Sequence, residues 1–228
     1  MKIGGFQRCS LTEYPGKIGA IIFTQGCNYR CHYCHNPELV LPELFAPLIP
    51  QEEIFDFLRR RPLLQAVTIT GGEPCLQSDL IDFIRQVKSF HLAVKINTNG
   101  SFPEIIFELL RQNLTDYISL DIKAPFPKYQ DVTGVTSDTT AVQESIRLLQ
   151  KGGCDYDFRT TVVSGLLNKE DFQIIGETVR GAKRYLLQRF VPAKLVNKQF
   201  LSRRSPSEEE MKEFQEIMSH YVEKCEII

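Results

Sequence analysis

The sequence predicts an α/β fold in which one sheet of parallel strands is connected by helices. Short runs rich in β-branched and aromatic residues alternate along nearly the whole chain with longer segments that repeat apolar residues at helical spacing. Six strands and six helices are expected, and this alternation is typical of a parallel sheet with right-handed crossovers. The strands are apolar on both faces, which fits either a doubly wound sheet or a partial barrel.

Each expected strand is a short apolar run bounded by turn residues. The first lies between Gly16 and Gly26, and the second is followed directly by Gly71 and Gly72. The six expected strands are, in chain order, 18–24, 66–70, 92–97, 117–122, 157–163 and 185–190.

The expected helices carry an apolar stripe and recognisable start signals. Ser78 and Asn168 are placed as N-caps of two of them, and a capping box from Ser205 to Glu208, with Pro206 at the first helical position, is expected to begin the last. The helices are expected at 51–61, 79–88, 103–112, 138–151, 169–180 and about 206–220.

The composition is that of an ordinary globular protein. The chain has 228 residues, of which 43% are hydrophobic and 24% charged, and this excludes a disordered chain and a collagen-like repeat. A net charge of −1 gives no general attraction to nucleic acid or to anionic membranes. No apolar run approaches the roughly 20 residues of a membrane span, and the first residues lack a signal-peptide core. We therefore expect a single domain over residues 1–228 in the cytoplasm, with no nucleic-acid or membrane partner.

Three of the seven cysteines form a close group after the first strand. Cys27, Cys31 and Cys34 have the spacing C-x3-C-x2-C in an irregular segment, 25–37, here called the cluster loop. Ligands of parallel α/β folds bind at the carboxyl ends of the strands, and this loop begins there. Three thiolates favour iron–sulfur, zinc or copper(I). His35 lies too close to Cys34 to complete a zinc tetrahedron, whereas a [4Fe–4S] cluster held by three cysteines keeps one iron open for chemistry.

Further motifs follow the next strands, and together they carry a family resemblance. Tyr33 precedes the last cysteine of the group, Gly71-Gly72-Glu73-Pro74 follows the second strand, and Asn97-Thr98-Asn99-Gly100 ends the third. This combination resembles the radical S-adenosylmethionine (SAM) superfamily. Cys34-His35-Asn36-Pro37 and Asp121-Ile122-Lys123 are similar to the glycyl-radical-enzyme activases. The opening motifs Gly5-Phe6-Gln7, Ser10-Leu11 and Tyr14-Pro15-Gly16 resemble those of the anaerobic ribonucleoside-triphosphate reductase activating proteins.

The resemblance implies a fold, two cofactors and a reaction. The fold would be a partial (β/α)6 radical SAM barrel with parallel strands. One [4Fe–4S] cluster would be held by Cys27, Cys31 and Cys34, and its open iron would bind SAM. One-electron reduction would cleave SAM to methionine and a 5′-deoxyadenosyl radical. The implied SAM-binding residues are Tyr33, Gly71, Gly72, Glu73, Thr98, Asp121, Lys123 and Arg159.

Several of these residues also have ordinary structural explanations. Gly71 and Gly72 lack a Cβ, so their backbone could approach a ligand closely, but a glycine pair after a strand is often a plain turn. Arg159 could meet the SAM carboxylate or ribose, or it could pair with an acidic neighbour. Asp121 and Lys123 could be a surface ion pair. Asn97 replaces an aspartate of some activases, which places a monovalent-cation site in doubt.

The leading functional prediction is an anaerobic activase. Its partner would be a glycyl radical enzyme, foremost the anaerobic ribonucleoside-triphosphate reductase, and its electron donor a protein such as flavodoxin or ferredoxin. A pyruvate formate-lyase-type activating enzyme is the nearest alternative. A small-molecule radical SAM enzyme, such as a 7-carboxy-7-deazaguanine synthase, and a zinc-stabilised binding module remain as further alternatives.

Two other features are noted at this stage. The remaining cysteines, which lack ligand spacing, are interpreted as small buried apolar residues: Cys9, Cys75, Cys154 and Cys225. The segment 183–204 contains seven Lys and Arg residues and no acidic residue. It is either an ordinary solvated surface or a docking surface for an acidic partner.

Overall fold

The computed structural model describes residues 1–228 and contains one sheet of eight strands. The strands lie side by side in chain order: β1 (Ile3–Ser10), β2 (Gly19–Thr24), β3 (Ala66–Gly71), β4 (Ala93–Thr98), β5 (Tyr117–Asp121), β6 (Asp155–Val162), β7 (Tyr185–Arg189) and β8 (Cys225–Ile227). β1 is antiparallel to β2, and every later pair is parallel. β1 and β8 do not pair, so the curved sheet is an open barrel.

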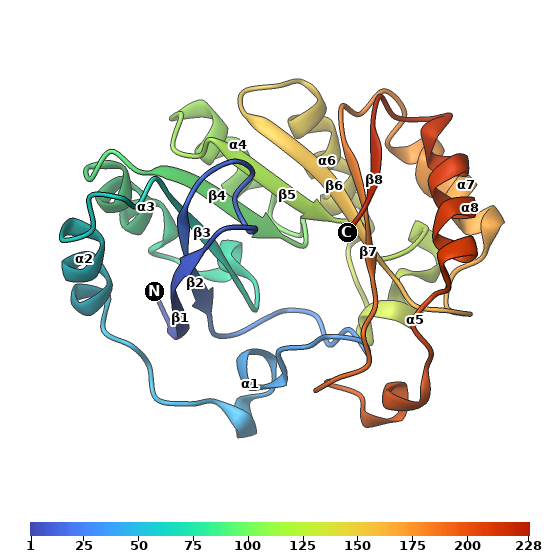
Figure 1. The fold of residues 1–228 in the computed structure, drawn as a ribbon, viewed down its shortest axis with the longest axis horizontal. Coiled ribbons are helices and arrows are strands. Elements are labelled where there is room, and N and C mark those ends of the chain that lie inside the picture. The colour runs from blue at the N-terminus through green and yellow to red at the C-terminus, as the bar shows by residue number, and fades with distance from the viewer.

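The longer helices cover the outer side of this sheet, as Figure 1 shows. They are α2 (Gln51–Arg59), α3 (Leu80–Lys88), α4 (Pro103–Arg111), α6 (Thr139–Gln150), α7 (Lys169–Thr178) and α8 (Glu208–Ser219). Two short helices, α1 (Pro37–Val40) and α5 (Tyr129–Thr133), lie beside the loops at the carboxyl ends of the strands. None of the helices is both long enough and apolar enough to cross a lipid bilayer.

The core lies between the sheet and the outer helices. Phe83 and Ile84 of α3 are buried together with Ile96 of β4, which accounts for the apolar stripe of the helix. Farther along, the rings of Phe172 in α7 and Phe214 in α8 stack with their centroids 4.2 Å apart. Loops with many polar residues follow the carboxyl ends of the strands, and the candidate site lies among these loops.

The six predicted strands are present, but two further strands were missed. β1 contains two glycines and the polar pair Gln7 and Arg8, so its sequence lacks the apolar pattern of a buried strand. β8 has only three residues, all half-buried. Both are edge strands with a partner on one side only, and for that reason their sequences are less constrained. The expectation of strictly parallel strands is therefore corrected for β1.

Two helix starts also differ from the prediction. Helix α8 begins after Ser207, whose side chain accepts from the N–H of Glu210, while the Glu210 side chain accepts from the N–H of Ser207. The capping box therefore lies two residues later than expected. Asp79, and not Ser78, is the N-cap of α3, and it makes no side-chain capping bond. Asn168 is the N-cap of α7, as predicted, and Asp138, expected as the first residue of its helix, is the N-cap of α6.

Candidate active site

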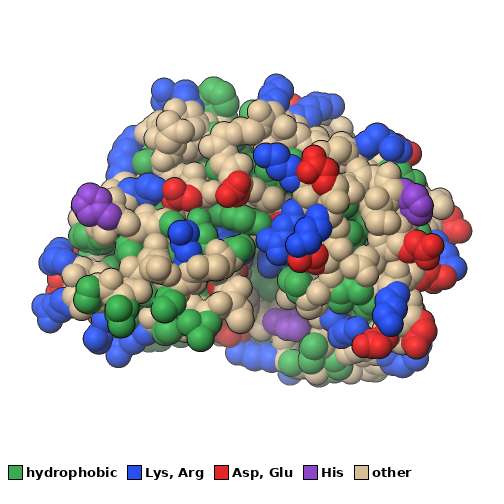
Figure 2. Space-filling model, turned by 45° about the horizontal axis from the view of Figure 1, so that its top comes forward, with side chains coloured by type: hydrophobic (Ala, Val, Ile, Leu, Met, Phe, Trp, Pro, Cys, Tyr) green, Lys and Arg blue, Asp and Glu red, His purple; other side chains and the backbone are tan.

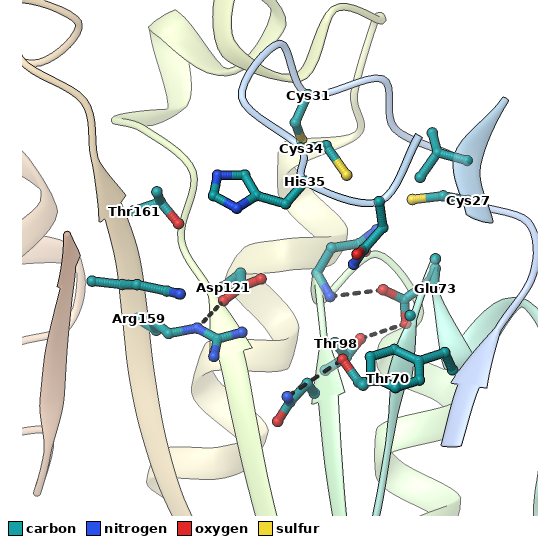
Figure 3. A pocket seen from close by; sticks show the side chains of 18 of the residues that line it. Cys27, Cys31, Cys34, His35, Thr70, Glu73, Thr98, Asp121, Arg159 and Thr161 are labelled. Atoms are coloured by element: carbon teal, nitrogen blue, oxygen red, sulfur yellow. Dashed lines mark hydrogen bonds and ion pairs between the residues drawn. The ribbon is translucent and has the colours of Figure 1, made fainter. Parts of the chain in front are cut away.

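A cavity of about 490 Å³ lies at the carboxyl ends of β2 to β6 and is also lined by residues of β1 and β7. It is visible in close-up in Figure 3, and Figure 2 shows a hollow near the centre of the face that it displays. The cavity is lined by all eleven residues that the sequence analysis singled out: Cys27, Tyr33, Cys31, Cys34, Gly71, Gly72, Glu73, Thr98, Asp121, Lys123 and Arg159. Residues spread over more than half of the chain are thus brought to one place.

The cluster loop is fixed by backbone hydrogen bonds on two sides. On one side the N–H of Arg30 donates to the carbonyl of Thr133 in α5, at 2.8 Å. On the other side the segment after β7 contributes the N–H of Val196, which donates to the carbonyl of Cys34 at 3.0 Å. The loop conformation therefore does not depend on the cysteine side chains alone.

The three thiols of this loop point toward a common space (Figure 3). Cys31 is buried, Cys27 and Cys34 are half-buried, and the N–H of Tyr29 donates to Cys27 Sγ at 3.4 Å. Burial raises the pKa of Cys27 to about 12 and that of Cys31 to about 11, because an unligated thiolate would lose its hydration. A bound metal centre removes this penalty, since a coordinating thiol is deprotonated by the cation.

The chemistry of the three thiols suits an iron–sulfur cluster. No three His, Cys, Asp or Glu side chains lie close enough together to hold one metal ion. An iron–sulfur cluster takes one thiolate per iron, so its ligands can stand further apart than those of one ion. Three soft thiols around a partly polar cavity are a suitable donor set for it.

Gly71 and Gly72 are required by contacts within the chain. A Cβ at Gly72 would overlap the carbonyl oxygen of Gly26 in the cluster loop, and one at Gly71 would overlap the backbone of Thr24. The N–H of Gly72 donates to the Thr24 carbonyl and that of Glu73 to the Gly26 carbonyl, both at 2.8 Å. The fit between the β3 turn and the loop after β2 is thus one reason for both glycines, and the expected approach to a ligand stays a prediction.

Glu73 is fully buried and bonded on both carboxylate oxygens. It accepts from the Thr98 hydroxyl at 2.7 Å, from the N–H of Asn99 at 2.8 Å and from the N–H of Cys75 at 3.0 Å. Burial raises the pKa of Glu73, while these hydrogen bonds oppose the rise. The carboxylate therefore ties the end of β3 to the end of β4.

Asp121 lies between two cations on the wall of the cavity. Its Oδ1 accepts from Arg159 Nε at 2.7 Å, and its Oδ2 accepts from Lys123 Nζ at 2.8 Å. Burial alone would raise the pKa of Asp121, but Arg159 and Lys123 hold it well below its usual range. The three side chains are mostly buried, so this is not a surface ion pair. The terminal nitrogens of Arg159 donate to no protein group, and the trio carries a net charge of +1.

The structure adds residues that the sequence analysis did not assign to the site. Glu13, in the β1–β2 connection, reaches the cavity, where its Oε1 accepts from Asn97 Nδ2 and its carbonyl from buried Lys95 Nζ, both at 2.7 Å. The signal available was the opening motif beside Tyr14. The other unassigned lining residues include Gln7, Ser10, Thr12, Thr70, Asn99, Thr161, Gln188 and Arg189.

The remaining cysteines and the basic segment are only partly as expected. Cys75 is buried and Cys154 and Cys225 are half-buried, but Cys9 is exposed, because it lies on edge strand β1. In the segment 183–204, Arg184 pairs with Glu226 and Lys194 with Glu38, both at 2.6 Å. The exposed cations without an acidic partner there are Lys183, Lys198, Arg203 and Arg204.

Comparison with known proteins gives consistent matches. The family model described as the radical SAM superfamily matches residues 21–180. A candidate glycyl-radical enzyme activating enzyme of Methanocaldococcus jannaschii is 34% identical over 233 residues, which cover 99% of this chain and 95% of that protein. The pyruvate formate-lyase 1-activating enzyme of Escherichia coli K12 is 29% identical over 179 residues, covering 75% of this chain and 71% of that protein.

Solved structures show the same fold at low sequence identity. A domain of the pyruvate-formate lyase-activating enzyme from Bacteroides vulgatus matches with a TM-score of 0.57 at 19% identity, covering 72% of this chain and 99% of that domain. Streptococcus suis SuiB bound to its precursor peptide SuiA matches with a TM-score of 0.65 at 13% identity, covering 87% of this chain and 44% of that protein. The predicted partial barrel is confirmed.

Proposed function

The chain belongs to the radical SAM superfamily and, within it, to the enzymes that activate glycyl radical enzymes, and we propose that its partner is an anaerobic ribonucleoside-triphosphate reductase. The observation that carries the proposal is the match over nearly the full length of an activating-enzyme relative, combined with three thiols around one cavity. The opening motif Tyr14-Pro15-Gly16 supports the choice of partner.

Enzymes of this superfamily use a [4Fe–4S] cluster and SAM, the cofactors expected from the sequence. When bound and reduced, the cluster would supply one electron to the sulfonium of SAM, and SAM would supply the 5′-deoxyadenosyl group that takes one hydrogen atom from a glycine Cα. We assign Cys27, Cys31 and Cys34 as the cluster ligands. Their position on a loop that is fixed by its own backbone bonds supports this assignment.

The roles of the cavity residues in binding SAM are inferred from the polar groups that make no hydrogen bond within the protein. Arg159 is assigned to an anionic or hydroxyl group of SAM, because its terminal nitrogens are unused and Asp121 fixes its orientation. The carbonyl oxygen of Gly72 accepts no bond from the protein, which suits the SAM ammonium. Glu73 and Thr98 hold the two neighbouring loops together, and the Glu73 carboxylate supplies negative charge beneath them. Tyr33, whose buried hydroxyl has no partner, completes the wall.

The partner reaction requires a reducing compartment and an electron donor. We place the enzyme in the cytoplasm, with a flavodoxin or ferredoxin as donor, and all seven cysteines are unpaired in the structure, in keeping with this location. Pyruvate formate-lyase is the second candidate partner, because activating enzymes of that protein in Escherichia coli and Clostridium pasteurianum are among the relatives.

The test is formation of a glycyl radical. Anaerobically reconstituted and reduced protein is mixed with SAM and with either candidate partner, and electron paramagnetic resonance is recorded. A glycyl radical signal with the reductase alone supports the proposal. A signal with pyruvate formate-lyase alone would contradict it and would identify pyruvate formate-lyase as the partner. A Cys31→Ala variant is the control: it should fold, because the loop retains its backbone bonds, but should give no 5′-deoxyadenosine. Zinc in place of iron in the wild type would contradict both candidates.

A further inference from the structure

The outer edge of β1 is free along most of its length. β1 is the first strand of the sheet, and its only sheet neighbour is β2. On the other edge the single backbone contact is at its start, where the N–H of Ile49 donates to the carbonyl of Ile3 at 2.9 Å. A local bond from the Gln7 side chain to the Cys9 carbonyl is the only other contact there. Gln7, Arg8 and Cys9 are exposed. Such an edge can pair with another extended chain.

The two faces of β1 lead to different environments. Gln7 lines the cavity of the candidate active site. Phe6 and Arg8 lie on the opposite face, where the Phe6 and Phe57 rings are 5.1 Å apart and the Arg8 guanidinium is 5.6 Å from the Phe57 ring. The register of β1 is regular from Gly5 to Gln7 and shifts before Ser10, so side chains of a strand added along the regular part would alternate between the same two faces.

A second, apolar cavity of about 430 Å³ lies on this opposite face, and we call it the outer groove. Leu63, 81% exposed, and Leu11, 70% exposed, leave apolar surface uncovered along it. Two cations flank it, since Arg61 also lies over the Phe57 ring, at 5.0 Å. The complete lining is Arg8, Cys9, Leu11, Ile18, Phe57, Arg61, Leu63 and Leu64. The groove therefore offers apolar contact together with positive charge.

We propose that an extended segment of the protein substrate pairs with the free edge of β1, with its target glycine facing the cavity and its alternate side chains in the outer groove. Main-chain hydrogen bonds would provide affinity, and the groove would select apolar side chains accompanied by an acidic one that meets Arg8 and Arg61. Strand pairing would also fix which residue faces the cavity, because a shift of one residue turns every side chain to the other face. This inference rests on the proposed function, in that the substrate is a protein.

The first test uses variants of the groove. Leu63→Asp and the double variant R8E/R61E should each raise the KM for the partner by about tenfold or more, while SAM cleavage without partner stays at the wild-type rate. Matched controls are Ile174→Asp, another exposed apolar residue, and Arg60→Glu, which neighbours the groove without lining it. Equal KM values for the groove variants and the controls would overturn the docking site.

The second test addresses strand pairing directly. Synthetic peptides centred on the glycine that acquires the radical are methylated at one backbone nitrogen at a time. Binding should weaken at every second position, since alternate N–H groups of a strand face its neighbour. Uniform sensitivity, or none, would overturn pairing even if activation is intact. Absence of any glycyl radical with wild-type protein would instead overturn the proposed function and this inference together. A dimer that Leu63→Asp dissociates would assign the edge to a second copy of this chain, against the proposal.

Discussion

Asp121 fixes the positions of both cations on the cavity wall. Its two carboxylate oxygens each accept from one of them, Arg159 through Nε and Lys123 through Nζ. The parallel register of β5 and β6 places Asp121 directly opposite Arg159. Without the carboxylate, two partly desolvated positive charges would face each other. Removing one partner of a buried ion pair lowers the free energy of unfolding by more than the intact pair contributes to it.

We predict that Asp121→Asn lowers the free energy of unfolding by about 3 kcal/mol at pH 7. The neighbouring cations hold the pKa of Asp121 below its value of about 3.9 in the unfolded chain, so this stability is fully present above that pH and is lost as the pH falls below it. Urea unfolding at pH 7 and at about pH 3 should show the difference between wild type and variant shrinking on acidification. Asp56→Asn, which removes an exposed pair with Arg59, is the control and should cost under about 1 kcal/mol. A difference that does not change with pH would contradict the assignment.

The sequence predicted which residues line the site better than it predicted what they contact. Thiol spacing and motifs at strand ends are local properties, and they identified Cys27 and Asp121. The partners of Glu73 come from two different strand ends, and Glu13 comes from a loop more than eighty residues before Asn97 and Lys95. Such contacts depend on how the sheet curves, which no local pattern encodes.

At the scale of elements, the turn after β3 and the loop after β2 fit together as one unit. Gly72 has an ordinary negative φ, so its conformation does not require glycine. What requires it is the carbonyl of Gly26, which occupies the space of a Cβ. The turn can therefore affect SAM binding through the shape of the cluster loop.

We predict that Gly72→Ala destabilises the protein by more than about 2 kcal/mol and lowers the iron bound per chain after reconstitution. The control is Gly5→Ala, whose Cβ would make an ordinary 3.4 Å contact with the Phe23 side chain. Urea unfolding and iron analysis provide the measurements. Normal stability and iron content with weakened SAM binding would show that the glycine is needed for ligand contact and not for the shape of the loop.

The start of α8 tests how well a capping motif can be positioned from sequence. Two serines, Ser205 and Ser207, precede a run of three glutamates, and either register satisfies the pattern. In the structure only Ser207 caps the helix. We predict a loss of about 1 kcal/mol for Ser207→Ala and a negligible one for Ser205→Ala, measured by chemical denaturation. The reverse order would move the helix start to the position first expected from the sequence.

At the scale of the molecule, the sheet is open between its edge strands β1 and β8, and a protein substrate must reach the cavity at the carboxyl ends of the strands. The alternation of strands and helices predicted the parallel part of the sheet, since buried strands carry continuous apolar runs. The edge strands β1 and β8 could not be predicted in the same way, because they are partly exposed and their sequences lack a continuous apolar run. The outer groove lies beside β1, and the basic segment 183–204 includes β7 and the chain that follows it. The two docking surfaces therefore lie on the β1 side and on the β7 side of the cavity.

The basic segment after β7 provides the last prediction. Lys194 forms an ion pair with Glu38 of α1, which follows the cluster loop. Its substitution could disturb this loop, so Lys194 is left out of the docking test. Lys198, Arg203 and Arg204 are exposed and have no acidic partner. Reversing these three charges should slow association with an acidic partner surface and flatten its dependence on salt, while partner-independent SAM cleavage is unchanged. The control reverses Arg147, Lys151 and Arg180, which lie at or just beyond the carboxyl ends of α6 and α7, at the opposite end of the strands from the cavity. Two of these cations pair with exposed glutamates, Arg147 with Glu144 and Arg180 with Glu177, so the control tests the effect of reversing three surface charges. If both triple variants activate the partner with wild-type rate and salt dependence, the segment is an ordinary solvated surface, and recognition depends on the β1 side of the cavity.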